Sequence, residues 1–303
     1  MSHQNRRKPE ADAGAAEPIG VLDPPVAFEP QAGKLRRPRP SAAMFVRALA
    51  AGLFGNCCVA CGVDAGARGL CLGCLRFARR IEARVARCDG CAEELPGRKR
   101  GMRSLDADDA AGARPYATGR RFCERCAIDA PPWSRAISGA AYAPPWDAIE
   151  LGLKFGGRLA NAAALAGLIE LGLRARRINL AGWTLLPVPL APERLARRGY
   201  NQADRIARAL AAATGARVDN GALSRRLDTP AVSALGRGAR ARVLAGAFEL
   251  TPTAHARLAG RRVALVDDVM TTGATLREAA RVIAARPREL CVLTALRTPP
   301  PES

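Results

Sequence analysis

The chain has 303 residues, of which 47 are Lys or Arg and 28 are Asp or Glu, so its formal net charge is +19. Hydrophobic residues make up 49% of it, too many for a wholly disordered chain. Aromatic residues make up 4%, which argues against a single-strand binder built on stacked bases. All but four of the basic residues are arginine. Such a bias can reflect the composition of the source genome, so the positive charge is weaker evidence for nucleic-acid binding than its size suggests. The charge still attracts polyanions in general.

Three regions of different composition follow one another. Residues 1–42 lack hydrophobic periodicity and predict a disordered tail. Residues 43–135 hold nine of the ten cysteines and include a polar, charged insertion near 97–121 that is expected to loop out. Residues 136–300 predict a domain of alternating strands and helices. No apolar run is long enough for a membrane span and no secretory signal is recognisable, so we expect a cytoplasmic protein whose cysteines are reduced or bind metal.

The cysteines of the second region form four C-x-x-C pairs. Two thiolates at this spacing can bind one cation from a tight turn, and two pairs complete the tetrahedral shell of a zinc ion. The sequence therefore predicts a small zinc-ribbon domain with two structural zinc sites, and their ligands are Cys58, Cys61, Cys71, Cys74, Cys88, Cys91, Cys123 and Cys126. Sequential pairing of the pairs is the simplest arrangement, and an interleaved pairing stays open.

Other roles for these cysteines have less support. A disulfide scaffold needs an oxidising compartment, for which the sequence has no signal. A catalytic zinc favours an open or mixed ligand shell, and the two histidines, His3 and His255, are far from the pairs in sequence. Cys57 could compete with Cys58 as a ligand, and Cys291 is expected to be a small buried residue of a strand.

The third region predicts an α/β fold. Strands are expected over 136–143, 183–190, 262–266 and 290–296, and the second of them should stop at its prolines. Helices are expected over 158–173, 201–213 and about 274–285. Strands separated by helices predict a mostly parallel sheet covered by helices on both faces.

The segment 262–276 is the most informative part of the chain. A short apolar strand brings Asp267 and Asp268 to the carboxyl edge of the sheet, where α/β folds bind their ligands. The small or hydroxylated residues that follow, before a helix, can bind a phosphate through backbone amides and hydroxyls; they are Thr271, Thr272, Gly273, Ala274 and Thr275. Acids beside a phosphate site suit a phosphorylated sugar, whose hydroxyls the aspartates would bind. An ordinary strand–turn–helix with a capped start is the structural alternative.

This segment resembles the phosphoribosyl pyrophosphate (PRPP) signature of type I phosphoribosyltransferases, and the wider pattern resembles the ComF (competence protein F, GntX-like) family. The resemblance covers roughly 45–298. Besides the cysteine pairs and the aspartate/threonine loop, it rests on 152–158 (GLKFGGR), 186–190 (LPVPL), 194–203 (RLARRGYNQA) and 246–248 (GAF).

The resemblance implies a type I phosphoribosyltransferase-like domain that binds PRPP with Mg²⁺. It makes Asp267 and Asp268 the catalytic residues, which would hold the ribose, and makes Arg198 and Lys154 phosphate contacts. A solvated helix face for the arginine and a surface position for the lysine are the alternatives. It also implies a lid over 225–248, where Val232 and Val243 depart from the family's usual glutamine and asparagine.

Two functions follow as expectations. The first is Mg-dependent PRPP binding, with phosphoribosyl transfer to an acceptor that no residue identifies, or with binding alone. The second is that of an accessory factor in DNA uptake, in which the zinc domain and the basic surface contact single-stranded DNA or a helicase and nothing is turned over.

Overall fold

The structure is a computed structural model and describes residues 57–65, 69–95, 113–115, 120–226 and 242–299. The predicted tail at 1–42 lies outside these residues, as does most of the charged insertion at 97–121. Within that insertion, β1 (Ala113–Pro115) pairs antiparallel with β2 (Arg121–Cys123).

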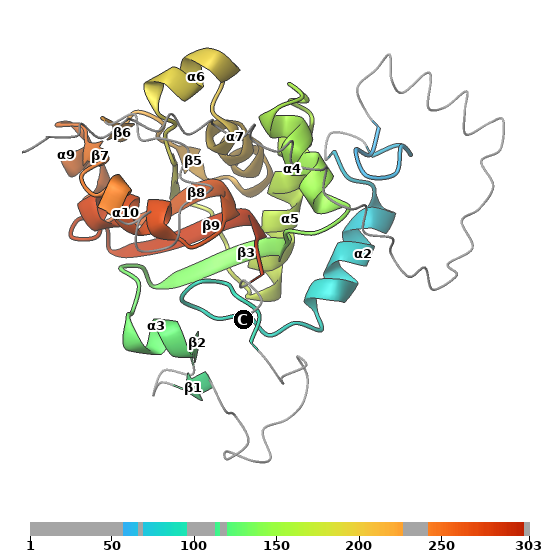
Figure 1. The fold of residues 1–303 in the computed structure, drawn as a ribbon, viewed down its shortest axis with the longest axis horizontal. Coiled ribbons are helices and arrows are strands. Elements are labelled where there is room, and N and C mark those ends of the chain that lie inside the picture. Colours follow the sequence, from blue (N-terminus) through green and yellow to red (C-terminus); the bar gives the residue numbers. More distant parts are fainter. Residues whose placement is uncertain (1–56, 66–68, 96–112, 116–119, 227–241, 300–303) are drawn as a thin grey trace, which may run out of the picture. The chain divides into compact units, whose positions relative to one another are not determined.

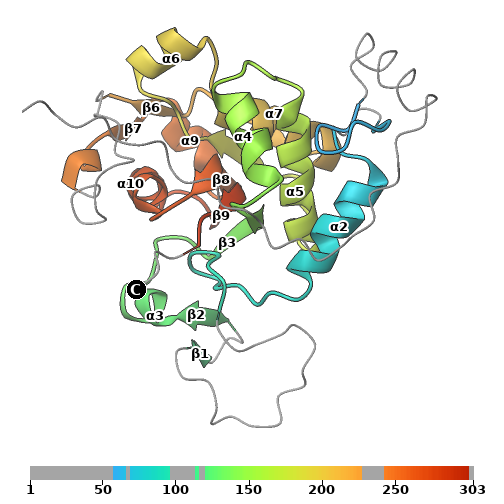
Figure 2. The ribbon, with the colours of Figure 1, turned by 45° about the vertical axis from the view of Figure 1, so that its right-hand side comes forward.

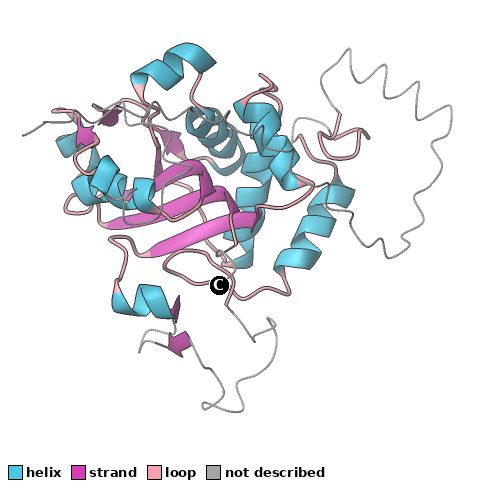
Figure 3. Ribbon diagram, viewed as in Figure 1, coloured by secondary structure: helices cyan, strands magenta, loops and turns pink. Residues whose placement is uncertain are grey.

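A parallel sheet forms the centre of the fold. Its five strands are β3 (Arg135–Ala141), β4 (Thr184–Pro187), β5 (Arg217–Val218), β8 (Arg262–Met270) and β9 (Glu289–Arg297). They lie in the order β3-β9-β8-β4-β5, and every neighbouring pair is parallel (Figures 1 and 3). The predicted α/β class is confirmed.

Helices cover both faces of this sheet (Figure 2). On one face lie α4 (Trp146–Lys154), α5 (Asn161–Ala175) and α7 (Gln202–Thr214); on the other lie α9 (Ala254–Leu258) and α10 (Ala274–Ile283). Because successive strand side chains point to opposite faces, Ala264 and Val266 of β8 join the first core and Val263 and Leu265 the second. All four strand residues are fully buried, so β8 is apolar on both sides.

Each strand and helix predicted in the third region is present, with some shifts. β4 stops at Pro187 as expected, whereas β8 continues through Asp267 and Asp268 to Met270, four residues beyond the predicted end. It does so because its pairing with β9 continues to Met270 and Arg297. Helix α6 (Pro192–Arg198), helix α4 and the hairpin of β6 (Leu223–Arg225) with β7 (Phe248–Leu250) were not predicted.

The connections leave a switch point between β4 and β8. From β4 the chain passes through α7 to β5 on one side, and from β8 it passes through α10 to β9 on the other. Where two such connections diverge, the carboxyl ends of the strands border a crevice that binds ligands in open α/β sheets. No helix in the described ranges is both long and apolar enough to cross a membrane.

Candidate functional site

The four cysteine pairs come together as two clusters of four thiols. Cys58, Cys61, Cys71 and Cys74 form the first cluster, and Cys88, Cys91, Cys123 and Cys126 form the second. In each cluster the ligand atoms all lie within 4.8 Å of one another. The pairing is therefore sequential, and the interleaved alternative is wrong.

Both clusters are built from the same two parts. The first pair of each lies in a tight turn closed by an antiparallel bridge, Cys57 to Asp64 in one cluster and Arg87 to Glu94 in the other. The second pair lies at the start of a helix: α2 (Leu72–Glu82) begins after Cys71, and α3 (Glu124–Ile128) after Cys123. Thiols in such turns and at helix N-termini face backbone N–H groups, which favour the thiolate that binds metal.

The geometry of the two clusters fits zinc. The sulfurs of Cys61 and Cys71 are 3.5 Å apart and those of Cys91 and Cys123 are 3.7 Å apart. Tetrahedral Zn–S bonds of about 2.3 Å would place sulfurs roughly 3.8 Å apart. Burial acts to raise the pKa of Cys58, but backbone amides that donate to its sulfur outweigh it and lower the pKa to about 7. The two clusters could therefore each hold one zinc ion.

Charged side chains surround the second cluster and tie it to the sheet. Glu93 forms ion pairs with Arg125 at 2.7 Å and with Arg297 at 3.1 Å. Arg297, at the end of β9, is 3% exposed, and it also donates to the carbonyl oxygens of Cys91 (2.8 Å) and Met270 (3.2 Å). Met270 is the last residue of β8, so one buried guanidinium joins the second cluster to the loop that follows this strand.

A cleft of about 1230 Å³ opens at the carboxyl ends of β4 and β8. Asp267, Asp268, Thr271, Thr272, Ala274 and Thr275 line one side, and Lys154, Arg194, Arg197 and Arg198 line another. All the residues that the sequence singled out for a sugar-phosphate site thus border this cleft, except Gly273, which lies in the same loop between Thr272 and Ala274. The cleft lies at the switch point of the sheet, where such a site is expected.

The loop after β8 has the backbone that an anion site needs. Gly273 adopts a φ of +78°, which favours glycine, and it precedes the first turn of α10. The Thr272 hydroxyl accepts from the Ala274 amide at 3.4 Å. Asp267 and Asp268 are half-buried, and each accepts a hydrogen bond from the amide of the next residue. Burial, reinforced by the charge of Asp268, raises the pKa of Asp267 well above its usual value.

The basic residues of the cleft lie at the ends of α4 and α6. The Lys154 ammonium and the Arg198 guanidinium lie 5.9 and 5.6 Å from the centre of the Phe155 ring. Burial lowers the pKa of Arg198, whereas for Lys154 the charges of Asp268 and Glu150 outweigh burial and raise the pKa. Both side chains therefore stay cationic at neutral pH and can bind phosphate oxygens.

The Arg-Arg-Gly-Tyr-Asn-Gln segment between α6 and α7 fixes this wall. Gly199 ends α6 with a φ of +77°. The Tyr200 hydroxyl donates to the Leu153 carbonyl in α4. Asn201 accepts from the Ala203 amide at the start of α7 and donates to the Val188 carbonyl after β4 at 2.9 Å. These bonds connect α4, the segment after β4 and the start of α7 next to Arg198. The role of this segment is therefore mainly structural.

Sequence reasoning missed Glu150, which pairs with the cleft-lining Lys154. Its side chain is 1% exposed and forms an ion pair with Lys154 at 3.2 Å. Burial and the charge of Asp268 raise its pKa to about 7. A Glu four residues before a Lys on a helix is typical of an exposed ion pair, so its local sequence gave no sign of burial.

We expect Glu150→Gln to change how stability depends on pH. Between about pH 4.5 and pH 7 the unfolded chain releases the Glu150 proton while the folded protein keeps it, so the unfolding free energy of the wild type falls over this range. The unfolding free energy of the variant does not fall in this way. The difference in unfolding free energy, variant minus wild type, should therefore rise by roughly 2–3 kcal/mol from pH 5 to pH 8. Urea unfolding at both pH values measures it.

Glu170→Gln is the matched control for that measurement. Glu170 also pairs with a basic residue four positions later, Arg174, but its side chain is 21% exposed. The same relative gain in both variants would contradict the role given to the burial of Glu150.

Part of the predicted lid lies outside the described residues, including the departure at Val232. The described parts of that segment are 225–226 and 242–248, and Arg225, the last residue of β6, lines the cleft. Val243, the second departure, is half-buried and does not line the cleft.

Comparison with known proteins places this chain in a family. The DNA utilization protein YhgH of Escherichia coli O6:H1 is 37% identical over 165 residues, which are 53% of this chain and 70% of that protein. YhgH of Salmonella typhimurium is 33% identical over 219 residues, which are 71% of this chain and 84% of that protein. The chain belongs to the ComF family. Competence protein F of Haemophilus influenzae is a more distant relative of this ComF protein, 29% identical over 218 residues and 84% of its own length. No family model matches the chain.

Proposed function

We propose that this ComF protein binds the magnesium salt of PRPP in the cleft between β4 and β8. The observation that supports this most is the juxtaposition of two acids with a threonine/glycine loop on one side and a set of basic residues on the other. A ligand with sugar hydroxyls and phosphates at both ends is complementary to all three groups. A purely anionic ligand would leave the two aspartates unmatched, and a neutral sugar would leave the arginines unmatched.

Each side of the cleft then has a distinct task. The amides and hydroxyls of 271–275 bind the 5′-phosphate, and Asp267 and Asp268 accept from the ribose hydroxyls. Lys154 and Arg198 bind the pyrophosphate oxygens. If phosphoribosyl transfer occurs, Mg²⁺ and these two cations stabilise the departing pyrophosphate, and the aspartates stabilise positive charge on the ribosyl group.

Ligand-induced thermal stabilisation tests this proposal. PRPP with Mg²⁺ should raise the melting temperature of the wild-type protein, and ribose 5-phosphate or pyrophosphate with Mg²⁺ should raise it less because each fills only part of the cleft. No shift with PRPP at concentrations where other phosphates give one would exclude the ligand. Release of pyrophosphate in the presence of candidate nitrogenous acceptors would then distinguish transfer from binding.

A second proposal concerns DNA. The names of the relatives, DNA utilization protein and competence protein F, support a role in DNA uptake or use, and the net charge of +19 suits a polyanionic partner. Titration of a labelled single-stranded oligonucleotide at increasing salt tests it. We expect an affinity that falls steeply with salt, and no measurable binding at about 0.1 M salt would contradict direct DNA contact and leave a protein partner such as a helicase.

A further inference from the structure

Helix α2 carries a row of arginines on its exposed side. The helix packs beside α5 (Figures 1 and 2), and Ala78, which is 1% exposed, belongs to the core between them. Because an α-helix has 3.6 residues per turn, Arg76, Arg80 and Arg84 fall on the opposite side, about one turn apart. All three are exposed, and Arg84 continues the helical path because its amide donates to the Ile81 carbonyl at 3.0 Å. These three residues are called the α2 row below.

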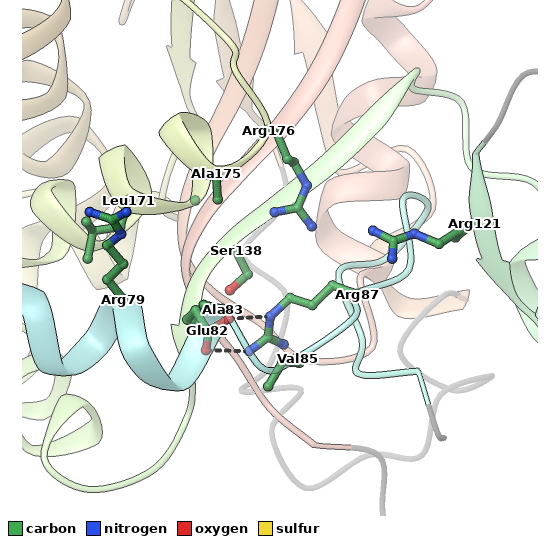
Figure 4. A pocket seen from close by; sticks show the side chains of 11 residues that line it. Arg79, Glu82, Ala83, Val85, Arg87, Arg121, Ser138, Leu171, Ala175 and Arg176 are labelled. Carbon is green, nitrogen blue, oxygen red and sulfur yellow. Dashed lines mark hydrogen bonds and ion pairs between the residues drawn. The ribbon is translucent and has the colours of Figure 1, made fainter. Parts of the chain in front are cut away.

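No acid of the described ranges forms an ion pair with the α2 row. The only acid of α2 is Glu82. Figure 4 shows that it is already engaged, because Arg87 donates to both of its oxygens at 2.7 Å. The remaining arginine of the helix, Arg79, lies beside Leu171 of α5 in the same view, so it is on the flank of α2 that faces α5. The charge of the α2 row is therefore available to a partner.

Other helices of the fold neutralise exposed arginines. On α5, α7 and α10 an acid one turn earlier pairs with an arginine; the pairs are Glu170 with Arg174, Asp204 with Arg208, and Glu278 with Arg281. Such pairs stabilise a helix, whereas like charges four residues apart destabilise it. Arg76 and Arg80 are such a like-charge pair, so a bound polyanion would remove a repulsion that α2 otherwise retains.

Apolar side chains border the α2 row on one flank. Phe77 and Ile81 directly follow its first two arginines in the sequence, and they are 50% and 41% exposed. The Phe77 ring also contacts Trp146 of α4, with 6.4 Å between the ring centroids, which holds the ring in place. Single exposed apolar residues are ordinary, but an aromatic ring grouped with unpaired cations on one helix face indicates a contact surface.

We propose that this face of α2 binds single-stranded DNA, with phosphates on Arg76, Arg80 and Arg84 and one base stacked on Phe77. Guanidinium groups match phosphate oxygens in a bidentate manner, and the arginines repeat every 6 Å or so (about 1.5 Å per residue) along the axis, which suits an extended strand. Any base can stack on a phenylalanine ring, whereas the bases of a duplex are already stacked on one another. Phosphate contacts dominate this mode, in keeping with a chain that has few aromatic residues.

The inference rests on the DNA role proposed above and adds the surface that carries it. This surface shares no residue with the lining of the cleft between β4 and β8. The inference is therefore unaffected if PRPP does not bind.

Affinity of the whole chain for an oligothymidine of about fifteen nucleotides tests the surface. Arg76→Gln/Arg80→Gln/Arg84→Gln should weaken binding on the order of tenfold or more at about 0.1 M salt. If each arginine binds one phosphate, the slope of log affinity against log salt should also become shallower by about two, because each contact with a single strand contributes about 0.7 to that slope.

A matched variant removes the same charge elsewhere. Arg261, Arg286 and Arg288 are exposed and lie just before β8 and β9. Their replacement by Gln should leave the salt slope unchanged and the affinity within about threefold. Equal losses in the two variants would reduce the effect to net charge and overturn the surface. An unchanged affinity in the α2 variant would overturn the surface alone, whereas no binding by the wild type would overturn the DNA role with it.

Phe77→Leu tests the stacked base. It keeps an apolar side chain against Trp146 but removes the aromatic ring. Affinity for the oligothymidine should fall about fivefold or more, and affinity for a duplex of the same length should not change. An equal change for both would overturn the base contact.

Protection of the wild-type protein makes the test independent of the variants. Phenylglyoxal modifies accessible guanidinium groups, and mass spectrometry of peptides reports each arginine separately. The oligothymidine should protect Arg76 and Arg80 and leave Arg286 as reactive as without ligand; equal reactivity of all three with and without it would overturn the surface. Circular dichroism and zinc content verify that the variants are folded.

An anionic membrane is the competing partner for a helix face of this kind. Vesicles of phosphatidylcholine with about a third phosphatidylserine form that arm of the experiment. We expect them not to compete with the oligothymidine at equal phosphate concentration. Vesicle binding that the α2 variant abolishes, together with an unchanged affinity for the oligothymidine, would assign the surface to a membrane and overturn the proposal.

Discussion

Cys58→Ser should lower the zinc content of the purified protein from about two equivalents per chain to about one, whereas Cys57→Ser should leave it unchanged. The two residues are adjacent, but Cys58 is part of a four-thiol cluster and Cys57 is not. A serine hydroxyl cannot replace the thiolate, so the remaining three ligands would hold zinc weakly. Metal analysis of the wild type and both variants measures the difference.

The same variant should lower thermal stability strongly. Cys58 is 2% exposed and belongs to the core that includes Leu70, Ala78 and helix α5, so loss of the first zinc disrupts packing beyond the cluster itself. Because structural zinc contributes roughly 10 kcal/mol or more in small zinc domains, we expect a loss of several kcal/mol here. Equal zinc loss in Cys57→Ser, or one zinc or none in the wild type, would contradict the assignment of two sites.

Asp267→Asn/Asp268→Asn should abolish the stabilisation of the protein by PRPP with Mg²⁺. Each carboxylate that accepts from a sugar hydroxyl contributes on the order of 1.5–3 kcal/mol, so the loss of both should weaken binding by about a hundredfold or more. Thermal shift with and without ligand measures this. The unliganded variant should melt higher than the wild type near neutral pH, because burial and the charge of Asp268 disfavour the ionised form of Asp267.

A lost ligand-induced shift together with a higher melting temperature of the unliganded variant would show that the binding site is lost while the fold is kept. Asp129→Asn/Asp147→Asn removes the same two charges outside the cleft lining and should keep the ligand-induced shift. A ligand shift that persists in the Asp267/Asp268 variant would show that PRPP, if it binds, binds elsewhere. A shift lost in both variants would point to net charge.

The features that could be predicted from the sequence are those that short segments of the chain determine. C-x-x-C spacing identified the thiols of both clusters, and an apolar strand followed by two acids and a threonine/glycine loop identified one side of the cleft. The sheet followed from apolar segments separated by helices. Each cysteine pair, each apolar segment and the aspartate/threonine loop lies within about fifteen consecutive residues, where periodicity and spacing are informative.

What could not be predicted depends on tertiary contact. Glu150 resembles a surface residue until α4 packs against the sheet and buries it at 1% exposure. Arg297 is one of many arginines, and its contacts with Cys91 and Glu93 span more than two hundred positions of the chain. Helix α2 is rich in arginine and lies between two cysteine pairs, so its polar sequence was not recognised as a helix.

The Arg297 guanidinium has a consequence for how the protein would respond to chelators. It donates hydrogen bonds to the Cys91 carbonyl and the Glu93 carboxylate, which belong to the second cysteine cluster and its turn. It also donates to the Met270 carbonyl at the end of β8. If that cluster loosened, a buried cation would lose its counter-charge, and the turn before Thr271 would lose a tether. Stripping metal from the second cysteine cluster should therefore weaken ligand binding in the cleft, so that ligand affinity reports whether this cluster holds its metal.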